Sequence, residues 1–164
     1  MEKLLKIYYF ILIRIVGKFN PAKATQISYK FYKKRGMKFN GVPNYISSKV
    51  YFDGGNYSLI EIGNGVTISS EVSFLTHDWA LNTVIKSTEF SYPGLLGRHK
   101  KIILEDNVFV GRGTIIMPGA VVGEGTIIGA GCVVRGVIPK FSVVIGNPCQ
   151  VIGDTRDYIK RFIN

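Results

Sequence analysis

The sequence predicts an all-β solenoid, because a six-residue repeat runs through the chain between residues 104 and 134. An unbroken aliphatic row occupies every sixth position: Leu104, Val110, Ile116, Val122, Ile128 and Val134. Small or β-branched residues occupy a second row, four positions further on: Val108, Thr114, Ala120, Thr126 and Cys132. Glycine recurs between the rows, at Gly111, Gly113, Gly119, Gly123, Gly125, Gly129 and Gly131. Short strands that bury alternate side chains and then turn a corner would close into a prism filled by these rows.

The corners of such a prism need residues that tolerate positive φ. Glycine adopts this backbone without steric cost, and Asn and Asp adopt it at a modest cost. Asn64-Gly65 and Asp106-Asn107 stand at matching points of the repeat. We therefore interpret both pairs as corner-forming residues rather than as ligands.

The repeat also carries a family resemblance. Residues 108–134 read VFVGRGTIIMPGAVVGEGTIIGAGCVV, and residues 145–152 read IGNPCQVI. These segments resemble the hexapeptide-repeat acyltransferases, in particular the sugar and polysaccharide O-acetyltransferases. The resemblance implies a left-handed parallel β-helix over residues 38–153. It is much less specific for the substrate than for the fold.

Length and composition set the outer limits of the prediction. With 164 residues and 46% apolar content, the chain is long enough for one domain with a sizeable core. The net charge of +10 favours an anionic partner, either a phosphorylated ligand or a membrane surface. No segment resembles a nucleic-acid-binding motif, so we expect no nucleic acid partner.

The cysteines and histidines argue against a metal site. Cys132 and Cys149 are not spaced as a metal-binding pair, and a buried free thiol is expected at Cys132 in a reducing cytoplasm. The γ-class carbonic anhydrases share the fold but need three histidine ligands for zinc, whereas this chain has two histidines. We therefore expect no metal.

Residues 1–37 are expected to form a helical extension. Leu4, Leu5, Ile7, Tyr8, Ile11, Leu12 and Ile15 form a broad apolar face of an amphipathic helix. Its uninterrupted apolar run, residues 7–13, is too short to cross a bilayer. Three roles remain open at this point: a signal peptide, packing on the β-helix or a neighbouring subunit, and a peripheral membrane contact through residues 1–18.

A second helix is expected after residue 20, with a further short helix at residues 154–164. Asn20 can cap the second helix, Pro21 suits its first position, and Gly36 stands where a glycine stop belongs. Near the C-terminus, Asp154 can cap the last helix. Both segments are read as structural.

The repeat begins unevenly and is interrupted once. Ile62, Ile68 and Phe74 have the spacing and phase of the later row, but continuing that phase would bury Lys86, Tyr92 and Arg98. These three residues are poor occupants of an apolar core. Residues 79–101 are therefore predicted to form a loop ejected from the solenoid, and long loops of this kind are often functional.

His77 lies at the start of this loop and is the candidate catalytic residue. The family resemblance implies acetyl transfer from acetyl-CoA, with a histidine at such a position as general base. An imidazole can take the proton of an attacking hydroxyl and return it to the departing thiolate. Asp78 or a backbone carbonyl could orient His77, and Asp78, Trp79 and His99 are the candidate substrate-binding residues.

Candidate coenzyme A contacts follow from the resemblance alone. The family binds the pantetheine along corners that correspond here to Gly111-Arg112 and Gly129-Ala130. It often has a basic residue after its Pro-Cys pair, where this chain has Gln150. Arg135 and Lys140 are the candidate replacements for the phosphate contact. The family's site lies between subunits, which implies a homotrimer.

The expected function is an O-acetyltransferase that acts on a sugar or a surface-polysaccharide precursor in the cytoplasm, at the inner face of the membrane if the N-terminal helix docks there. An amino-sugar N-acetyltransferase or a serine acetyltransferase is the alternative within the family, although the latter usually has a much larger N-terminal helical domain. A non-catalytic β-helix scaffold is the alternative of another class.

Overall fold

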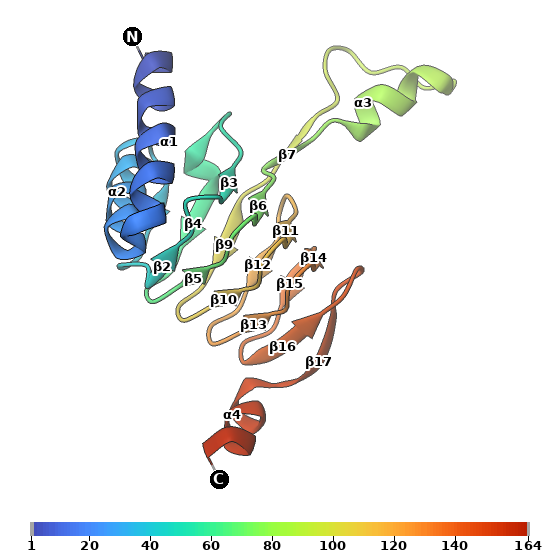
Figure 1. Cartoon of the computed structure of the whole chain (residues 1–164). Coiled ribbons are helices and arrows are strands. Elements are labelled where there is room, and N and C mark those ends of the chain that lie inside the picture. The colour runs from blue at the N-terminus through green and yellow to red at the C-terminus, as the bar shows by residue number, and fades with distance from the viewer. Residues whose placement is uncertain (1, 164) are drawn as a thin grey trace.

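The computed structural model describes residues 2–163 as a parallel β-helix with two helices at one end and one helix at the other (Figure 1). Short strands form the three faces of the solenoid, the strands of successive coils pair in parallel within each face, and the coils stack along the axis. The prediction of an all-β solenoid with N-terminal helices and a short C-terminal helix is confirmed.

Each face of the solenoid is one sheet. The first contains β1 (Lys38–Phe39), β4 (Ile60–Ile62), β9 (Ile102–Leu104), β12 (Val121–Val122) and β15 (Val137–Ile138), in that order. The second runs from β2 (Tyr45–Ile46) through β5 (Thr67–Ile68), β10 (Phe109–Val110) and β13 (Ile127–Ile128) to β16 (Ser142–Ile145) and the antiparallel β17 (Gln150–Asp154). The third contains β3 (Tyr51–Phe52), β6 (Ser73–Phe74), β11 (Ile115–Ile116) and β14 (Val133–Val134).

The aliphatic row fills the core as the repeat predicts. All six of its members, from Leu104 to Val134, are 0% exposed, and the small row from Val108 to Cys132 is equally buried. Val122 pairs with Leu104 of the preceding coil, so equivalent residues stack directly above one another. The period therefore determines both which side chains are buried and which strands are neighbours.

The corners contain the predicted positive-φ residues. Gly65 has φ 67° and Asn107 has φ 56°. The Oδ1 of Asp106 accepts a hydrogen bond from the backbone N–H of Asn64 at 2.8 Å, which joins the corners of adjacent coils. Both pairs thus serve the fold, as expected.

Helices α1 (Glu2–Phe19) and α2 (Pro21–Lys34) form a hairpin at the N-terminal end. The side chain of Asn20 caps α2 by accepting a hydrogen bond from the backbone N–H of Lys23 at 2.9 Å. At the other end, Asp154 precedes α4 (Thr155–Ile163) and accepts from the backbone N–H of Arg156. Both expected capping residues are found in these places.

The solenoid is interrupted between β6 and β9 by a projecting arm. The arm contains β7 (His77–Asp78), α3 (Ala80–Val84), a 3-10 turn at Ile85–Ser87, and β8 (Arg98–His99). It extends away from the coils rather than folding back on them (Figure 1). The predicted ejection of residues 79–101 is visible as this arm, whose two-stranded stem begins at His77.

Candidate functional site

The stem of the arm brings the two histidines together. β7 and β8 pair antiparallel, with His77 opposite His99, and the two imidazole rings are stacked with their centroids 5.9 Å apart. The backbone N–H of Lys100 donates to the carbonyl of Thr76 at 3.0 Å and ties the stem to the last coil before the break. His77 therefore lies on a hydrogen-bonded stem, where its backbone position is fixed.

Asp53 is the residue that orients the His77 ring. It directly follows β3, and β3 pairs with β6 so that Phe52 lies opposite Phe74. Asp53 thereby reaches the chain that leaves β6, and its Oδ2 meets the Nδ1 of His77 in a short hydrogen bond. The Asp53 side chain is buried, whereas the His77 side chain is 37% exposed. The pair thus has a buried carboxylate behind an accessible imidazole.

Thr76 completes the setting of the carboxylate. Its hydroxyl and its backbone N–H both donate to the Oδ2 of Asp53, at 2.8 and 3.1 Å. Burial by itself would raise the pKa of Asp53, but the hydrogen bonds from Thr76 and His77 together outweigh it and lower the pKa below its usual value. Asp53 is therefore ionised at neutral pH and accepts hydrogen bonds only.

The ionised carboxylate fixes the tautomer of the imidazole. Because Asp53 can only accept, the Nδ1 of His77 must carry the hydrogen that lies between them. In the neutral ring the Nε2 then keeps its lone pair, since one ring nitrogen is a donor and the other an acceptor. This arrangement presents a proton acceptor at the exposed side of His77.

Sequence reasoning did not identify Asp53. The sequence offers Asp78 or a backbone carbonyl to orient His77, whereas in the structure the carboxylate comes from the coil below. The sequence does contain a signal for this contact. Asp53 follows the inward aromatic Phe52 as Leu75 follows Phe74, so Asp53 and Leu75 occupy equivalent positions of successive coils. The uneven first coil obscured it, because 22 residues separate Phe52 from Phe74 rather than 18.

Asp78 and Trp79 serve the geometry of the arm. The Oδ1 of Asp78 accepts a hydrogen bond from the backbone N–H of Ala80 at 2.9 Å, where α3 begins. The indole of Trp79 lies against Gly97 so closely that a Cβ at Gly97 would come within 2.3 Å of it. The same indole meets the His99 ring edge-on at 5.5 Å. Trp79 thus packs the two strands of the stem against each other.

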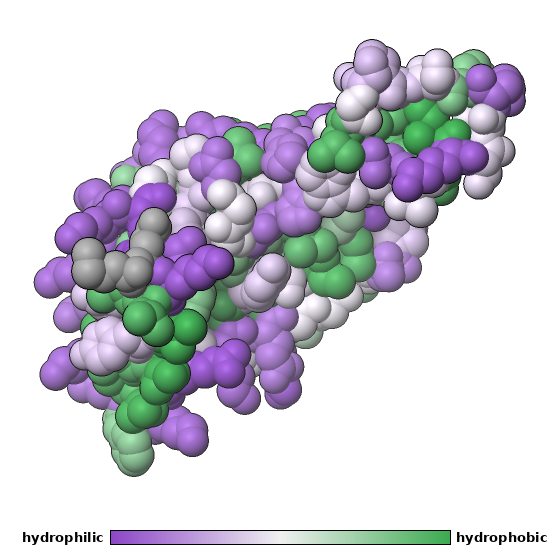
Figure 2. All heavy atoms as spheres, turned by 90° about the horizontal axis from the view of Figure 1, so that it is seen from above, coloured by the Kyte–Doolittle hydropathy of each residue, from purple (hydrophilic) through white to green (hydrophobic). Residues whose placement is uncertain are grey.

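The rest of the arm carries large apolar side chains in the open. Val84, Phe90, Tyr92 and Leu95 are all more than half exposed. In Figure 2 the arm is the projection at the upper right, with hydrophobic residues on its surface. Apolar area of this kind, next to a candidate catalytic residue, is typical of a segment that is covered by another molecule.

Four of the candidate coenzyme A residues meet at one corner of two successive coils. A Cβ on Gly111 would lie 2.5 Å from the backbone nitrogen of Ala130, so only glycine allows this approach, and Gly129 is part of the same contact. Arg112 lies at the edge of this corner and forms a two-pronged ion pair with Glu71, at 2.9 to 3.1 Å. The fold therefore brings Gly111, Arg112, Gly129 and Ala130 together.

The two candidate phosphate-binding residues lie elsewhere. Arg135 is exposed at the corner between the third and first faces, where the arm leaves in an earlier coil. Lys140 lies at the corner between the first and second faces, 3.4 Å from carboxylate oxygens of both Glu105 and Glu124. These carboxylates raise the pKa of Lys140 and already balance the positive charge of its ammonium group. Within one subunit, Arg135 and Lys140 do not join the Gly111 corner.

Among residues 2–163, no group of three or more His, Cys, Asp and Glu side chains is placed to hold a metal ion. Cys132 and Cys149 are free thiols, and Cys132 is buried at the small position of the repeat, as expected.

Comparison with known proteins identifies the family of the chain. The fold defines it as a left-handed parallel β-helix of the hexapeptide class, and residues 101–136 match the bacterial transferase hexapeptide family (six repeats). The chain is 38% identical to Protein CapG of Staphylococcus aureus over 126 residues, which is 77% of this chain and 70% of CapG. The chain belongs to the hexapeptide-repeat acyltransferase family.

Solved structures agree on the fold. A maltose O-acetyltransferase from Clostridium difficile 630 matches with a TM-score of 0.61 and 22% identity, covering 94% of this chain and 89% of that one. A galactoside acetyltransferase in complex with coenzyme A matches with a TM-score of 0.59 and 23% identity, covering 94% and 82%. At these identities the likeness concerns the fold.

Proposed function

We propose that the protein transfers the acetyl group of acetyl-CoA to a hydroxyl of a sugar or a surface-polysaccharide precursor. The observation that carries this proposal is the Asp53–His77 pair, which presents an oriented imidazole where the projecting arm leaves the solenoid. Two solved structures of the same fold support it, because one is a maltose O-acetyltransferase and the other a galactoside acetyltransferase with coenzyme A bound.

In the proposed reaction the Nε2 of His77 accepts the proton of the acceptor hydroxyl as its oxygen attacks the thioester carbonyl carbon. The tetrahedral intermediate then collapses by breaking the carbon–sulfur bond. The coenzyme A thiolate leaves and takes the proton back from His77, so that the products are the acetyl ester and the free thiol. Asp53 stays ionised throughout and stabilises the imidazolium that forms between the two steps.

Coenzyme A is proposed to lie along the corner formed by Gly111, Arg112, Gly129 and Ala130. Arg112 can offer its guanidinium to the nucleotide phosphates, although it must then share it with Glu71. Lys140 is the weaker candidate because two carboxylates already balance its positive charge. The side chain of Arg135 is exposed.

A homotrimer is proposed because the two halves of the site lie on different corners of one subunit. His77 is at the corner of the third and first faces, and Gly111 is at the corner of the second and third faces. Around a threefold axis the arm of one subunit can cover a neighbour, which would bury Phe90, Tyr92 and Leu95. His99 and Trp79 on the stem, with Asp78, would then face the acceptor.

The cytoplasm is proposed as the compartment, since acetyl-CoA is supplied there and both thiols are free. In the part of the chain that the structure describes, no helix has the length and hydropathy to cross a membrane.

The decisive experiment incubates the protein with acetyl-CoA and a panel of acceptors, and follows the release of free thiol. Maltose, a galactoside, an amino sugar and L-serine distinguish the hydroxyl reaction from the amine reaction, with the product identified by mass spectrometry. We expect an acetyl ester on a sugar. Failure to bind coenzyme A in calorimetry, even at millimolar ligand, would instead support a non-catalytic scaffold.

A further inference from the structure

The N-terminal hairpin, formed by α1 and α2, holds most of the excess positive charge. Residues 1–35 contain one acidic residue, Glu2, against nine basic ones: Lys3, Lys6, Arg14, Lys18, Lys23, Lys30, Lys33, Lys34 and Arg35. Fewer than a quarter of the residues thus carry nine of the 21 Lys and Arg. Such a surface attracts anionic partners.

The hairpin also exposes a row of large apolar side chains. Along α1, the residues at helical spacings of three and four are more than half exposed: Leu4, Ile7, Tyr8, Ile11 and Ile15. Leu4 has the largest exposed fraction of the five, 72%. Figure 2 shows hydrophobic atoms gathered at the end of the molecule opposite the arm, with hydrophilic atoms around them. An apolar helix face with basic neighbours is the signature of a helix that lies in a membrane interface.

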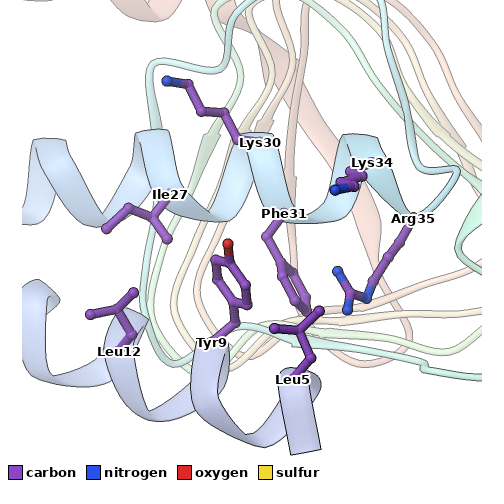
Figure 3. Close-up of a pocket in the computed structure, with 8 residues that line it drawn as sticks. All are labelled: Leu5, Tyr9, Leu12, Ile27, Lys30, Phe31, Lys34 and Arg35. Carbon is purple, nitrogen blue, oxygen red and sulfur yellow. The ribbon is translucent and has the colours of Figure 1, made fainter. Parts of the chain in front are cut away.

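A groove between the two helices combines both features. It encloses about 530 Å³, and Leu5, Tyr9 and Leu12 point into it from α1 while Phe31 points into it from α2 (Figure 3). Arg35 reaches into the same space with its guanidinium 4.0 Å from the centre of the Phe31 ring, and Lys34 lines the same end. The groove is thus apolar along its length and cationic at one end.

The Nε of Arg35 has no hydrogen-bond partner although it is buried. Buried donors are almost always paired with protein groups, water or a ligand, so an orphan donor beside a cationic groove calls for an acceptor. A phosphate at the end of the groove would pair with the Arg35 guanidinium, and Lys34 would add a second charge to the same group.

We propose that the N-terminal hairpin docks on the surface of an anionic phospholipid bilayer, with a lipid phosphate held by Lys34 and Arg35 at the end of the groove. The lipid's apolar part then lies against Leu5, Tyr9 and Phe31, and the α1 row enters the interface. This partner goes beyond acetyl transfer, and its test uses neither coenzyme A nor an acceptor.

Charge argues against the hairpin of a second copy of this chain as the occupant. A contact between two hairpins would place nine basic residues against nine, with Glu2 as the one acid on each side. Anionic lipid headgroups neutralise the same residues, and each Lys or Arg near such a surface contributes attraction that adds to burial of the apolar row.

The test is sedimentation of the full-length protein with vesicles of phosphatidylcholine that contain about 30% phosphatidylglycerol. Pure phosphatidylcholine vesicles are the comparison. We expect the protein to sediment with the anionic vesicles and to remain in solution with the neutral ones. Equal binding to both, or to neither, would overturn the proposal.

Two pairs of matched variants locate the contact. Lys34→Gln with Arg35→Gln is expected to weaken binding about 30-fold, whereas Lys86→Gln with Arg161→Gln removes the same charge elsewhere and is expected to change it less than about threefold. Leu4→Ser with Ile7→Ser is expected to lose most of the binding that Ile159→Ser with Phe162→Ser retains. Circular dichroism checks that each variant is folded.

The outcome that would favour a second copy is equally clear. If Leu4→Ser with Ile7→Ser lowers the mass measured by light scattering and leaves vesicle binding unchanged, the apolar row is a subunit contact and the proposal is wrong. Because no acyl transfer is measured, this failure would leave the acetyltransferase proposal untouched, and the reverse also holds.

Discussion

The Oδ2 of Asp53 contacts the Nδ1 of His77 across two successive coils, from the end of β3 to the first residue of the arm. The carboxylate accepts three hydrogen bonds, one from His77 and two from Thr76. These bonds hold its pKa below the usual value despite burial. The pairing of β3 with β6 therefore determines which carboxylate orients the imidazole at the break in the solenoid.

Replacing His77 tests the proposed base directly. His77→Ala is expected to lower kcat/KM for acetyl transfer by about 10²- to 10⁴-fold, because the acceptor hydroxyl then loses its proton acceptor. Thiol release with acetyl-CoA and the identified acceptor measures the effect. Calorimetry should show unchanged coenzyme A binding. A folded variant that keeps full activity would rule out this mechanism.

Replacing Asp53 tests the orientation of the imidazole. The amide of Asp53→Asn can donate to the Nδ1 of His77, which favours the tautomer with its hydrogen on Nε2 and removes the proton acceptor. We expect kcat to fall by about 10²-fold or more, with little change in the KM for the acceptor.

The double variant is the control for this interpretation. If Asp53 acts through His77, Asp53→Asn combined with His77→Ala should be no slower than His77→Ala alone. Additive losses would show that Asp53 contributes to the site in another way, for example by supporting the stem through Thr76.

The solenoid could be predicted from the sequence because its period repeats without change from Leu104 to Val134. A six-residue step fixes which side chains point inward, and three steps return the chain to the same face, as the pairing of Val122 with Leu104 confirms. The arm could be predicted for the complementary reason, since residues such as Lys86 cannot fill the core. Both predictions depend on local pattern alone.

The orientation of His77 could not be predicted in the same way. It depends on a contact between residues 24 positions apart, in the coil where the period is broken. The 3-10 turn η1 (Tyr57–Leu59) and the residues before it lengthen that coil, so that 22 residues rather than 18 separate the paired Phe52 and Phe74. Side-chain contacts across an irregular coil need the structure.

The arm is expected to act between subunits. Phe90→Ser with Leu95→Ser removes exposed apolar area without touching the coils, so the unfolding temperature of the solenoid should change little. If the arm covers a neighbour, light scattering should show a smaller assembly and the KM for the acceptor should rise about tenfold. Ile159→Ser with Phe162→Ser on α4 provides a comparison of equal apolar loss, and an identical effect of both pairs would contradict a specific role of the arm.

Glu61 makes the stability of the solenoid depend on pH. Its side chain is 10% exposed and accepts hydrogen bonds from Lys101 at 2.6 Å, Asn40 at 2.6 Å and Lys38 at 2.9 Å. These partners, with Lys101 the strongest, lower the pKa of Glu61 from 4.5 to about 2. They also join the first coil to the strand that follows the arm, so the ion pair links segments on both sides of the break.

Because the pKa of Glu61 is lower in the folded state, its contribution is present above the unfolded pKa and is lost as the pH falls through the folded value. Glu61→Gln is therefore expected to cost about 3 kcal/mol in the free energy of unfolding at pH 7, and this difference should shrink between pH 4.5 and about pH 2. Urea unfolding across this range measures it. Glu71→Gln is the control, since its pair with Arg112 is exposed and is expected to contribute less than about 1 kcal/mol. A pH-independent effect of Glu61→Gln would mean that packing, rather than charge, accounts for the loss.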